Sequence, residues 1–133
     1  MHNGSCLCGT VRYQISGELG PGYFCHCQRC RKASGSAFGA NAMVRSEDFV
    51  VTAGKASFNC FKAQTGLGRY FCAECGSPIM SVRESQPEVM RIRLGTLDTP
   101  LPQPPQAHIF VSSKAAWDVI HDTLPQYPER PPT

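Results

Sequence analysis

Long apolar runs are missing from this 133-residue chain, as are a basic-then-apolar start and any extended tract of like charge. No stretch approaches the roughly 18 consecutive apolar residues of a membrane-spanning helix, so we expect no membrane partner. The start, Met1 to Ser5, does not resemble a secretory signal, which predicts a cytoplasmic location. Charged residues make up only 17% of the chain and the net charge is +3. This mild basicity argues against a nucleic-acid partner.

Cysteine, in contrast, is abundant, because the chain contains eight cysteines. Disulfides do not persist in the reducing cytoplasm that we expect for this chain. Short Cys-x-Cys and Cys-x-x-Cys spacings suit a metal site, since ligands must converge on a point a few ångströms wide. The cysteines therefore favour metal binding over a disulfide framework.

The spacing divides seven of the cysteines between two sites. They are Cys6 and Cys8, then Cys25, Cys27 and Cys30, then Cys72 and Cys75. The first and last pairs, each followed by glycine, together supply the four thiolates of a closed structural zinc site. The middle group supplies three ligands, which leaves one position of a tetrahedral zinc open for chemistry.

Local geometry explains how these thiols converge. Cys6 and Cys8 are expected to share one face of a strand, because side chains two apart project to the same side. In the same way Cys25 and Cys27 point together, and the histidine between them, His26, points away. A helical turn would bring the third thiol of the middle group back beside them.

One alternative leaves the second site without an open position, because Cys60 could complete it. Cys60 lies near Phe58 and Phe61 in an expected strand, which instead favours a buried, inert thiol. No clear general base lies beside the middle group. We expect Glu74 to be a surface residue, and a lone histidine such as His108 is more often structural than a proton shuttle.

Short alternating and β-branched runs predict a mainly β fold of short, mostly antiparallel strands with little helix. Strands are expected over 11–15, 23–24, 38–44, 49–52, 57–62, 69–72, 79–82, 89–94 and 108–111. Helical turns are expected over 28–33, ended by Gly35, and over Lys114–Trp117. We expect one small domain over residues 1–124 and a proline-rich tail, loose or lying on the surface, over residues 125–133.

Three motifs also carry a resemblance to a known family. They are Gly-x-Cys-x-Cys-Gly-x-Val from Gly4, Cys-His-Cys-x-x-Cys-Arg-Lys-x-x-Gly from Cys25, and Phe-Cys-x-x-Cys-Gly-Ser-Pro from Phe71. In this order they resemble the glutathione-dependent formaldehyde-activating enzyme family, which includes centromere protein V. The resemblance covers Gly4 to Trp117 and implies a β-tent-like zinc fold.

The resemblance implies a structural zinc on the first and last cysteine pairs and a catalytic zinc on the middle group. Zinc with three thiolates carries a formal charge of −1, which suits exchange of a soft fourth ligand such as a substrate thiolate. We therefore expect a zinc-dependent carbon–sulfur lyase with two Zn²⁺ per chain. Its substrate would be a thiol–aldehyde adduct such as S-(hydroxymethyl)glutathione, with glutathione as the first candidate thiol.

Basic residues follow the middle group and suggest how such a thiol peptide is held. Arg29, Arg31 and Lys32 could offset the anionic centre and receive carboxylates, or they could simply form a solvated basic turn. Two rival functions remain open at this point. One is a zinc-ribbon-like module that binds nucleic acid or protein, and the other is a thiol-based redox or metal sensor.

Overall fold

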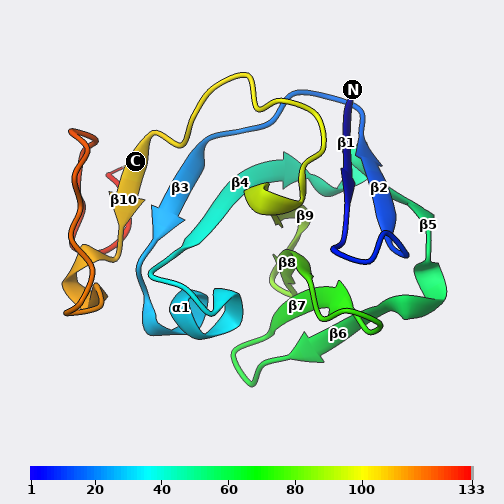
Figure 1. The fold of residues 1–133 in the computed structure, drawn as a ribbon, viewed down its shortest axis with the longest axis horizontal. Helices are drawn as coiled ribbons and strands as arrows, with labels where there is room; N and C mark the ends of the chain where they lie inside the picture. The colour runs from blue at the N-terminus through cyan, green and yellow to red at the C-terminus, as the bar shows by residue number, and fades with distance from the viewer. Residues whose placement is uncertain (133) are drawn as a thin grey trace. The chain divides into compact units, whose positions relative to one another are not determined.

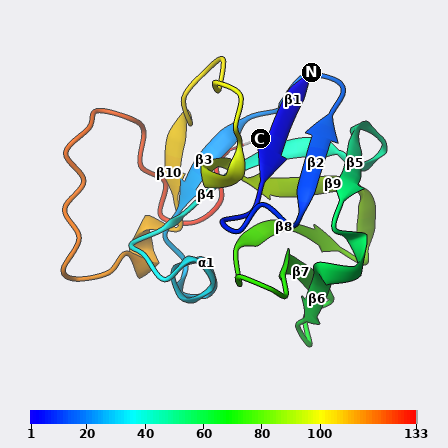
Figure 2. The ribbon, with the colours of Figure 1, turned by 45° about the vertical axis from the view of Figure 1, so that its right-hand side comes forward.

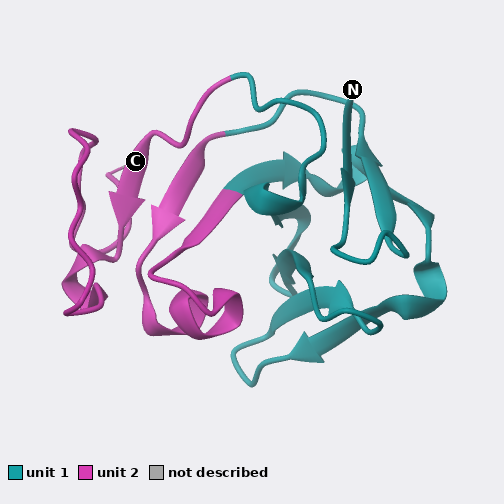
Figure 3. Ribbon diagram, viewed as in Figure 1, with its two compact units in different colours: residues 1–20, 42–102 teal, residues 21–41, 103–133 magenta. Residues whose placement is uncertain are grey.

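The structure of the protein, a computed structural model, describes residues 1–132. These residues form two compact units (Figure 3). Unit 1 combines residues 1–20 with residues 42–102, and unit 2 combines residues 21–41 with the segment from Gln103 onward. Strands predominate and the described residues contain one α-helix, which confirms the mainly β fold. None of the described helices has the length and apolar character needed to cross a membrane.

Unit 1 contains most of the strands. Strand β2 lies between β1 and β5 and pairs antiparallel with both (Figure 2). Strands β6, β7, β8 and β9 follow one another as antiparallel neighbours. The strands are β1 (His2–Ser5), β2 (Arg12–Ile15), β5 (Phe49–Ala53), β6 (Phe58–Lys62), β7 (Leu67–Cys72), β8 (Pro78–Arg83) and β9 (Gln86–Arg93). Short 3₁₀ turns lie at η1 (Ser46–Asp48), η2 (Lys55–Ser57) and η3 (Leu94–Thr96).

Strand β2 shows how the sequence alternation builds the core of unit 1. Tyr13 and Ile15 are buried while the residues between and before them are exposed, as a period of two requires. The ring of Tyr13 stacks on Phe49 with 5.1 Å between centroids. Gly4 faces this ring so closely that a Cβ atom at position 4 would collide with it. The core extends through buried aliphatic side chains of β8 and β9.

Unit 2 contains strands β3 (Gly22–Cys25) and β10 (Ala107–Ile109), helix α1 (Gln28–Ser34) and a 3₁₀ turn, η4 (Val111–Ser113). Strand β10 pairs in parallel with β3, an exception to the antiparallel pattern (Figure 1). Helix α1 begins directly after the thiol-bearing end of β3 and ends at Gly35, which adopts the left-handed conformation with φ 65°. This helix lies where the sequence predicts it. Strand β4 (Gly39–Arg45) begins in unit 2 and ends in unit 1.

Two local predictions are wrong. Cys6 and Cys8 lie in a turn that follows β1 and not in a strand, because the chain reverses here to form the β1–β2 hairpin. The helical turn expected over Lys114–Trp117 instead lies over Val111–Ser113. At its start the Val111 carbonyl accepts the backbone N–H of Lys114 over 3.0 Å.

The proline-rich tail, which we expected to be loose or to lie on the surface, is bound by its backbone. The N–H of His108 donates to the carbonyl of Pro125, and the N–H of Tyr127 donates to the carbonyl of His108, each over 2.9 Å. The guanidinium of Arg130 lies 5.8 Å from the ring centroid of Phe110, a cation–π distance. The tail therefore continues the hydrogen bonding of β10.

Candidate metal centres

The first thiol cluster belongs to unit 1 and joins two tight turns. One turn follows β1 and carries Cys6 and Cys8, and the other begins at Cys72, the last residue of β7, and also carries Cys75. In each turn the glycine after the second cysteine donates its N–H to the carbonyl of the first cysteine, over 3.0 and 2.7 Å. Both glycines have φ of 79°, a conformation that glycine adopts without steric cost. Each turn thus presents two thiols on one side.

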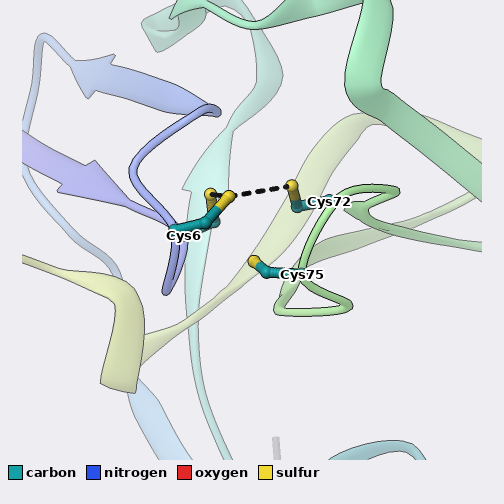
Figure 4. Close-up of side chains that lie close together, drawn as sticks. Cys6, Cys72 and Cys75 are labelled. Carbon is teal, nitrogen blue, oxygen red and sulfur yellow. Dashed lines mark hydrogen bonds between the residues drawn. The ribbon is translucent and has the colours of Figure 1, made fainter.

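The four Sγ atoms of this cluster lie within 4.8 Å of one another. The Sγ atoms of Cys6 and Cys8 are 3.6 Å apart, and those of Cys8 and Cys72 are 3.9 Å apart. In Figure 4 the sulfurs of Cys6, Cys72 and Cys75 face a common space. A tetrahedral zinc with Zn–S bonds of about 2.3 Å separates its sulfur ligands by roughly 3.8 Å. The four thiols could therefore hold a metal ion, and the donor set and spacing are compatible with zinc.

Hydrogen bonds and burial shift the pKa values of the thiols in this cluster in different directions. Hydrogen bonds from Ser77, whose Oγ lies 3.3 Å from the sulfur, lower the pKa of Cys75 to about 5. Burial raises the pKa of Cys72 to about 11. Burial also raises the pKa of Cys6, but the backbone N–H of Val11 at 3.2 Å and the neighbouring thiols outweigh it, so that its pKa is lowered overall. The cluster is thus partly prepared for the thiolate form that metal binding requires.

The second cluster belongs to unit 2 and forms where β3 runs into α1. Cys25 ends β3, and Cys27 caps the N-terminus of α1 by accepting the backbone N–H of Cys30 over 3.4 Å. The Sγ atoms of Cys25 and Cys27 are 3.4 Å apart, and all three sulfurs lie within 4.8 Å of one another. Cys25 is buried, whereas the other two are half-buried. These three thiols could also hold a metal ion.

The three thiols strongly perturb one another. The hydrogen bond from Cys25 lowers the pKa of Cys27 to about 2, with a further contribution from Cys30. The same hydrogen bond raises the pKa of Cys25, since Cys25 is the donor. A bound cation would remove this difference between the thiols, because it stabilises all three sulfurs as thiolates.

His26, between two of these cysteines, does not join the thiol cluster but begins a chain of side chains that runs through the buried His108 to the exposed Asp122. Its Nε2 lies 2.8 Å from Nδ1 of His108, whose Nε2 lies 2.9 Å from the Asp122 carboxylate. Because the Asp122 carboxylate can only accept, the N–H of His108 is on Nε2. Its Nδ1 is then an acceptor, and His26 donates to it. Burial lowers the pKa of His26, and the hydrogen bond from His108 lowers the pKa of Asp122. His108, which we expected to be structural, thus has two hydrogen-bond partners.

The sequence contains no local signal for this chain of side chains. His26 and His108 are 82 positions apart, and only the parallel pairing of β10 with β3 brings their segments together. The other ring nitrogen of His26, Nδ1, has no hydrogen-bond partner among the described residues. It lies 3.9 Å from Oδ2 of Asp118, a residue that the sequence analysis did not single out.

The three basic residues near the second cluster keep their charges available. Arg29 and Lys32 are exposed, and Arg31 is half-buried. Nε of Arg31 is buried and has no hydrogen-bond partner among residues 1–132. Within that range none of the three forms an ion pair. Their charges are therefore available to an anionic ligand.

Cys60 belongs to neither cluster of the described residues. The expected burial of its thiol is wrong, because Cys60 is exposed on β6. Strand β6 comes last in its strand order, and after Phe58 all of its residues are exposed. Glu74 is exposed, as predicted.

Comparisons with known proteins place these clusters in a context. The profile of one family, described as glutathione-dependent formaldehyde-activating enzyme, matches residues 1–113. A protein of Halomonas elongata, provisionally named as such an enzyme, is 31% identical over 121 residues, which cover 86% of this chain and 77% of the relative. Relatives from Aspergillus flavus and Aspergillus oryzae, provisionally named in the same way, are each 25% identical over 114 residues. That match covers 84% of this chain but only 53% of each Aspergillus protein.

A solved structure supports the fold. The crystal structure of a Rhodobacter sphaeroides protein matches with a TM-score of 0.64 at 24% sequence identity. The match covers 77% of this chain and 97% of that protein. At this level of identity the likeness concerns the fold alone.

Proposed function

The chain belongs to the glutathione-dependent formaldehyde-activating enzyme family, and from this premise we propose that it is a zinc-dependent carbon–sulfur lyase. It forms or cleaves a thiol–aldehyde adduct such as S-(hydroxymethyl)glutathione. The observation that carries the proposal is the second cluster, where three Sγ atoms converge within 4.8 Å and no fourth ligating residue of the described chain joins them.

The two clusters suggest different roles because they differ in ligand number. We assign the four thiols of unit 1, Cys6, Cys8, Cys72 and Cys75, to a structural zinc. We assign the three thiols of unit 2 to a catalytic zinc. Zinc held there by three thiolates would supply an open, soft position at which a substrate thiol binds as its thiolate.

The reaction itself requires few groups from the chain. In adduct formation the thiolate sulfur attacks the carbonyl carbon of formaldehyde, a C–S bond forms, and the carbonyl π electrons move to oxygen, which takes up one proton. Cleavage reverses each change. The half-burial of Cys27 and Cys30 leaves the site accessible to a small thiol, and the charges of Arg29, Arg31 and Lys32 would offset the anionic centre and receive carboxylates of the thiol peptide.

The remaining assignments are part of the same proposal. Residues 1–124 would form the zinc-binding catalytic region and residues 125–133 its proline-rich C-terminal extension. A cytoplasmic location would keep all eight thiols reduced, and all eight are free in the structure.

Zinc content and turnover test this proposal together. The wild-type protein should bind two zinc ions and convert glutathione plus formaldehyde into the adduct. Cys30→Ser should lose the zinc of unit 2 and lower turnover about a hundredfold or more, because it removes one of three ligands. Cys60→Ser is the matched control and should keep both zinc ions and full turnover.

Two results would count against the proposal. A wild-type protein with two zinc ions that leaves the adduct unformed and uncleaved would exclude this substrate. Loss of one zinc in Cys60→Ser would show that the second site is closed by a fourth thiolate.

A further inference from the structure

Asn41 of β4 is a buried polar residue that the proposed mechanism does not use. It is 9% exposed, and its Oδ1 is buried without a hydrogen-bond partner among residues 1–132. Buried amide oxygens without a partner are rare, because such an oxygen gives up its bonds to water on folding. The described chain thus leaves this acceptor without a donor.

Asn41 adjoins the second thiol cluster through Gly39. These two residues lie two positions apart on β4 and so face the same side of the strand. A Cβ atom at Gly39 would lie 3.3 Å from Cβ of Cys30, and 3.4 and 3.6 Å from Nδ2 and Oδ1 of Asn41. The absence of a side chain at position 39 thus lets the amide of Asn41 and the side chain of Cys30 approach the same glycine closely.

A further contact fixes this arrangement. The hydroxyl of Ser34, at the end of α1, lies 2.7 Å from the carbonyl of Cys30 and 3.1 Å from that of Phe38. Both carbonyls can accept from this hydroxyl, which connects the helix that carries Cys30 to the residue before β4. The position of Asn41 beside the cluster is therefore supported by the fold and does not depend on a mobile loop.

We propose that Asn41 orients the substrate by accepting a hydrogen bond from the hydroxyl of the thiol–aldehyde adduct, an inference that rests on the proposed function. An amide oxygen accepts and cannot donate, so its partner must carry an O–H or N–H group. In an S-hydroxymethyl adduct the hydroxyl is two bonds from the sulfur. It is therefore the donor closest to a sulfur held at the cysteine cluster, whereas the peptide N–H groups of the thiol lie further away.

This hydrogen bond would do two things for the reaction. It would limit rotation about the C–S bond and keep the reacting carbon in one orientation, which favours reaction. It would also select for adducts with a free hydroxyl over plain S-alkyl thioethers, because a thioether leaves the buried oxygen without a partner. A neutral amide does not take the proton, so Asn41 is a substrate-orienting residue and not a general base.

Asn41→Leu removes the acceptor at nearly constant volume and tests the assignment. We expect kcat/KM for S-(hydroxymethyl)glutathione to fall about ten- to hundredfold, with zinc content unchanged at two per chain. In titration calorimetry the Asn41→Leu variant should bind S-methylglutathione, which has no hydroxyl, with the same affinity as the wild type or a higher one. Asn41→Asp retains an acceptor oxygen and should keep more of the activity than Asn41→Leu. The control Asn59→Leu replaces an exposed asparagine of β6 and should change none of these values.

The outcomes separate this inference from the proposed function. Wild-type protein that fails to turn over the adduct would remove both. Active wild type with an equally active Asn41→Leu variant would overturn the role of Asn41 alone and assign its partner to a buried water. Loss of one zinc in Asn41→Leu would also overturn it, because Asn41 would then support the metal. If Asn41→Leu does not fold, Asn41→Ala removes the same acceptor without adding bulk and gives the same comparison.

Discussion

Tyr13 shows how burial controls the chemistry of a single residue in unit 1. Its side chain is 1% exposed, and its hydroxyl lies 2.7 Å from Oγ1 of Thr96. Burial raises the pKa of Tyr13 from 10.0 to about 12. The pKa of Tyr13 is therefore higher in the folded state than in the unfolded state. The part of the folding stability that depends on the neutral phenol is complete below pH 10 and is lost as the pH rises to 12. The neutral phenol is thus part of the folded core.

We predict that Tyr13→Phe removes this part of the alkaline loss of stability. The wild type should lose about 2–3 kcal/mol more than the variant between roughly pH 10 and pH 12, as measured by urea unfolding. At pH 7 the variant should be about 1 kcal/mol less stable, because it lacks the hydrogen bond to Thr96. Thr96→Val serves as the control: it removes this hydrogen bond, together with the one from Thr96 Oγ1 to the carbonyl of Arg93, but keeps the phenol, so its alkaline loss should persist. Equal pH profiles for wild type and Tyr13→Phe would contradict this account.

At the scale of elements, the tail from Pro125 matters because it forms hydrogen bonds with backbone groups at the outer edge of β10. An unpaired strand edge exposes backbone N–H and C=O groups that other chains can pair with. Here the backbone of His108 donates to and accepts from the tail, and its side chain forms a hydrogen bond with His26. The tail thus supports the element that buries His26.

Proline scanning of the tail tests this pairing. Tyr127→Pro removes an N–H that donates to the carbonyl of His108, and we expect unit 2 to lose about 1 kcal/mol or more of stability. Gln126→Pro is the control, because Gln126 faces His108 in the bridge while its neighbours make the hydrogen bonds. Hydrogen exchange of the β10 amides reports the effect. Similar protection in the two variants would argue that the tail is not bound by its backbone in solution.

At the scale of the whole molecule, each compact unit carries one thiol cluster. The cluster of unit 1 joins turns that are 64 residues apart between Cys8 and Cys72, so a metal there would close a long loop. The cluster of unit 2 lies within six residues, so a metal there would close only a very short loop. A metal in unit 1 should therefore contribute to folding much more than a metal in unit 2.

If both clusters bind zinc as we propose, a chelator should remove the two ions in separate steps. The ion of unit 2 should leave first, because it has three protein ligands instead of four, and turnover should be lost with little change in the melting temperature. Release of the second ion should unfold unit 1, since structural zinc contributes on the order of 10 kcal/mol in small domains. Metal release, activity and circular dichroism recorded on one sample would follow the steps. Unfolding that coincides with the first ion would reverse the two roles.

The sequence by itself determined the features that depend on neighbours along the chain. The thiols fall into groups because their spacings are short, and a turn or a first helical turn is enough to make them converge. Helix α1 was predictable for the same reason, since Gly35 supplies the left-handed residue that ends it. The exposure of Cys60 was not predictable, because aromatic neighbours on a strand look the same at an edge as in the middle of a sheet.

Only the tertiary structure decided which distant side chains meet. His26 reaches His108 across 82 positions, and Asn41 adjoins Cys30 because Gly39 has no side chain between them. Such contacts depend on strand order and register, which a sequence pattern of period two leaves open, since it specifies the buried face of a strand but not its partner. The two cysteine clusters were therefore readable from the sequence, whereas the groups around them were not.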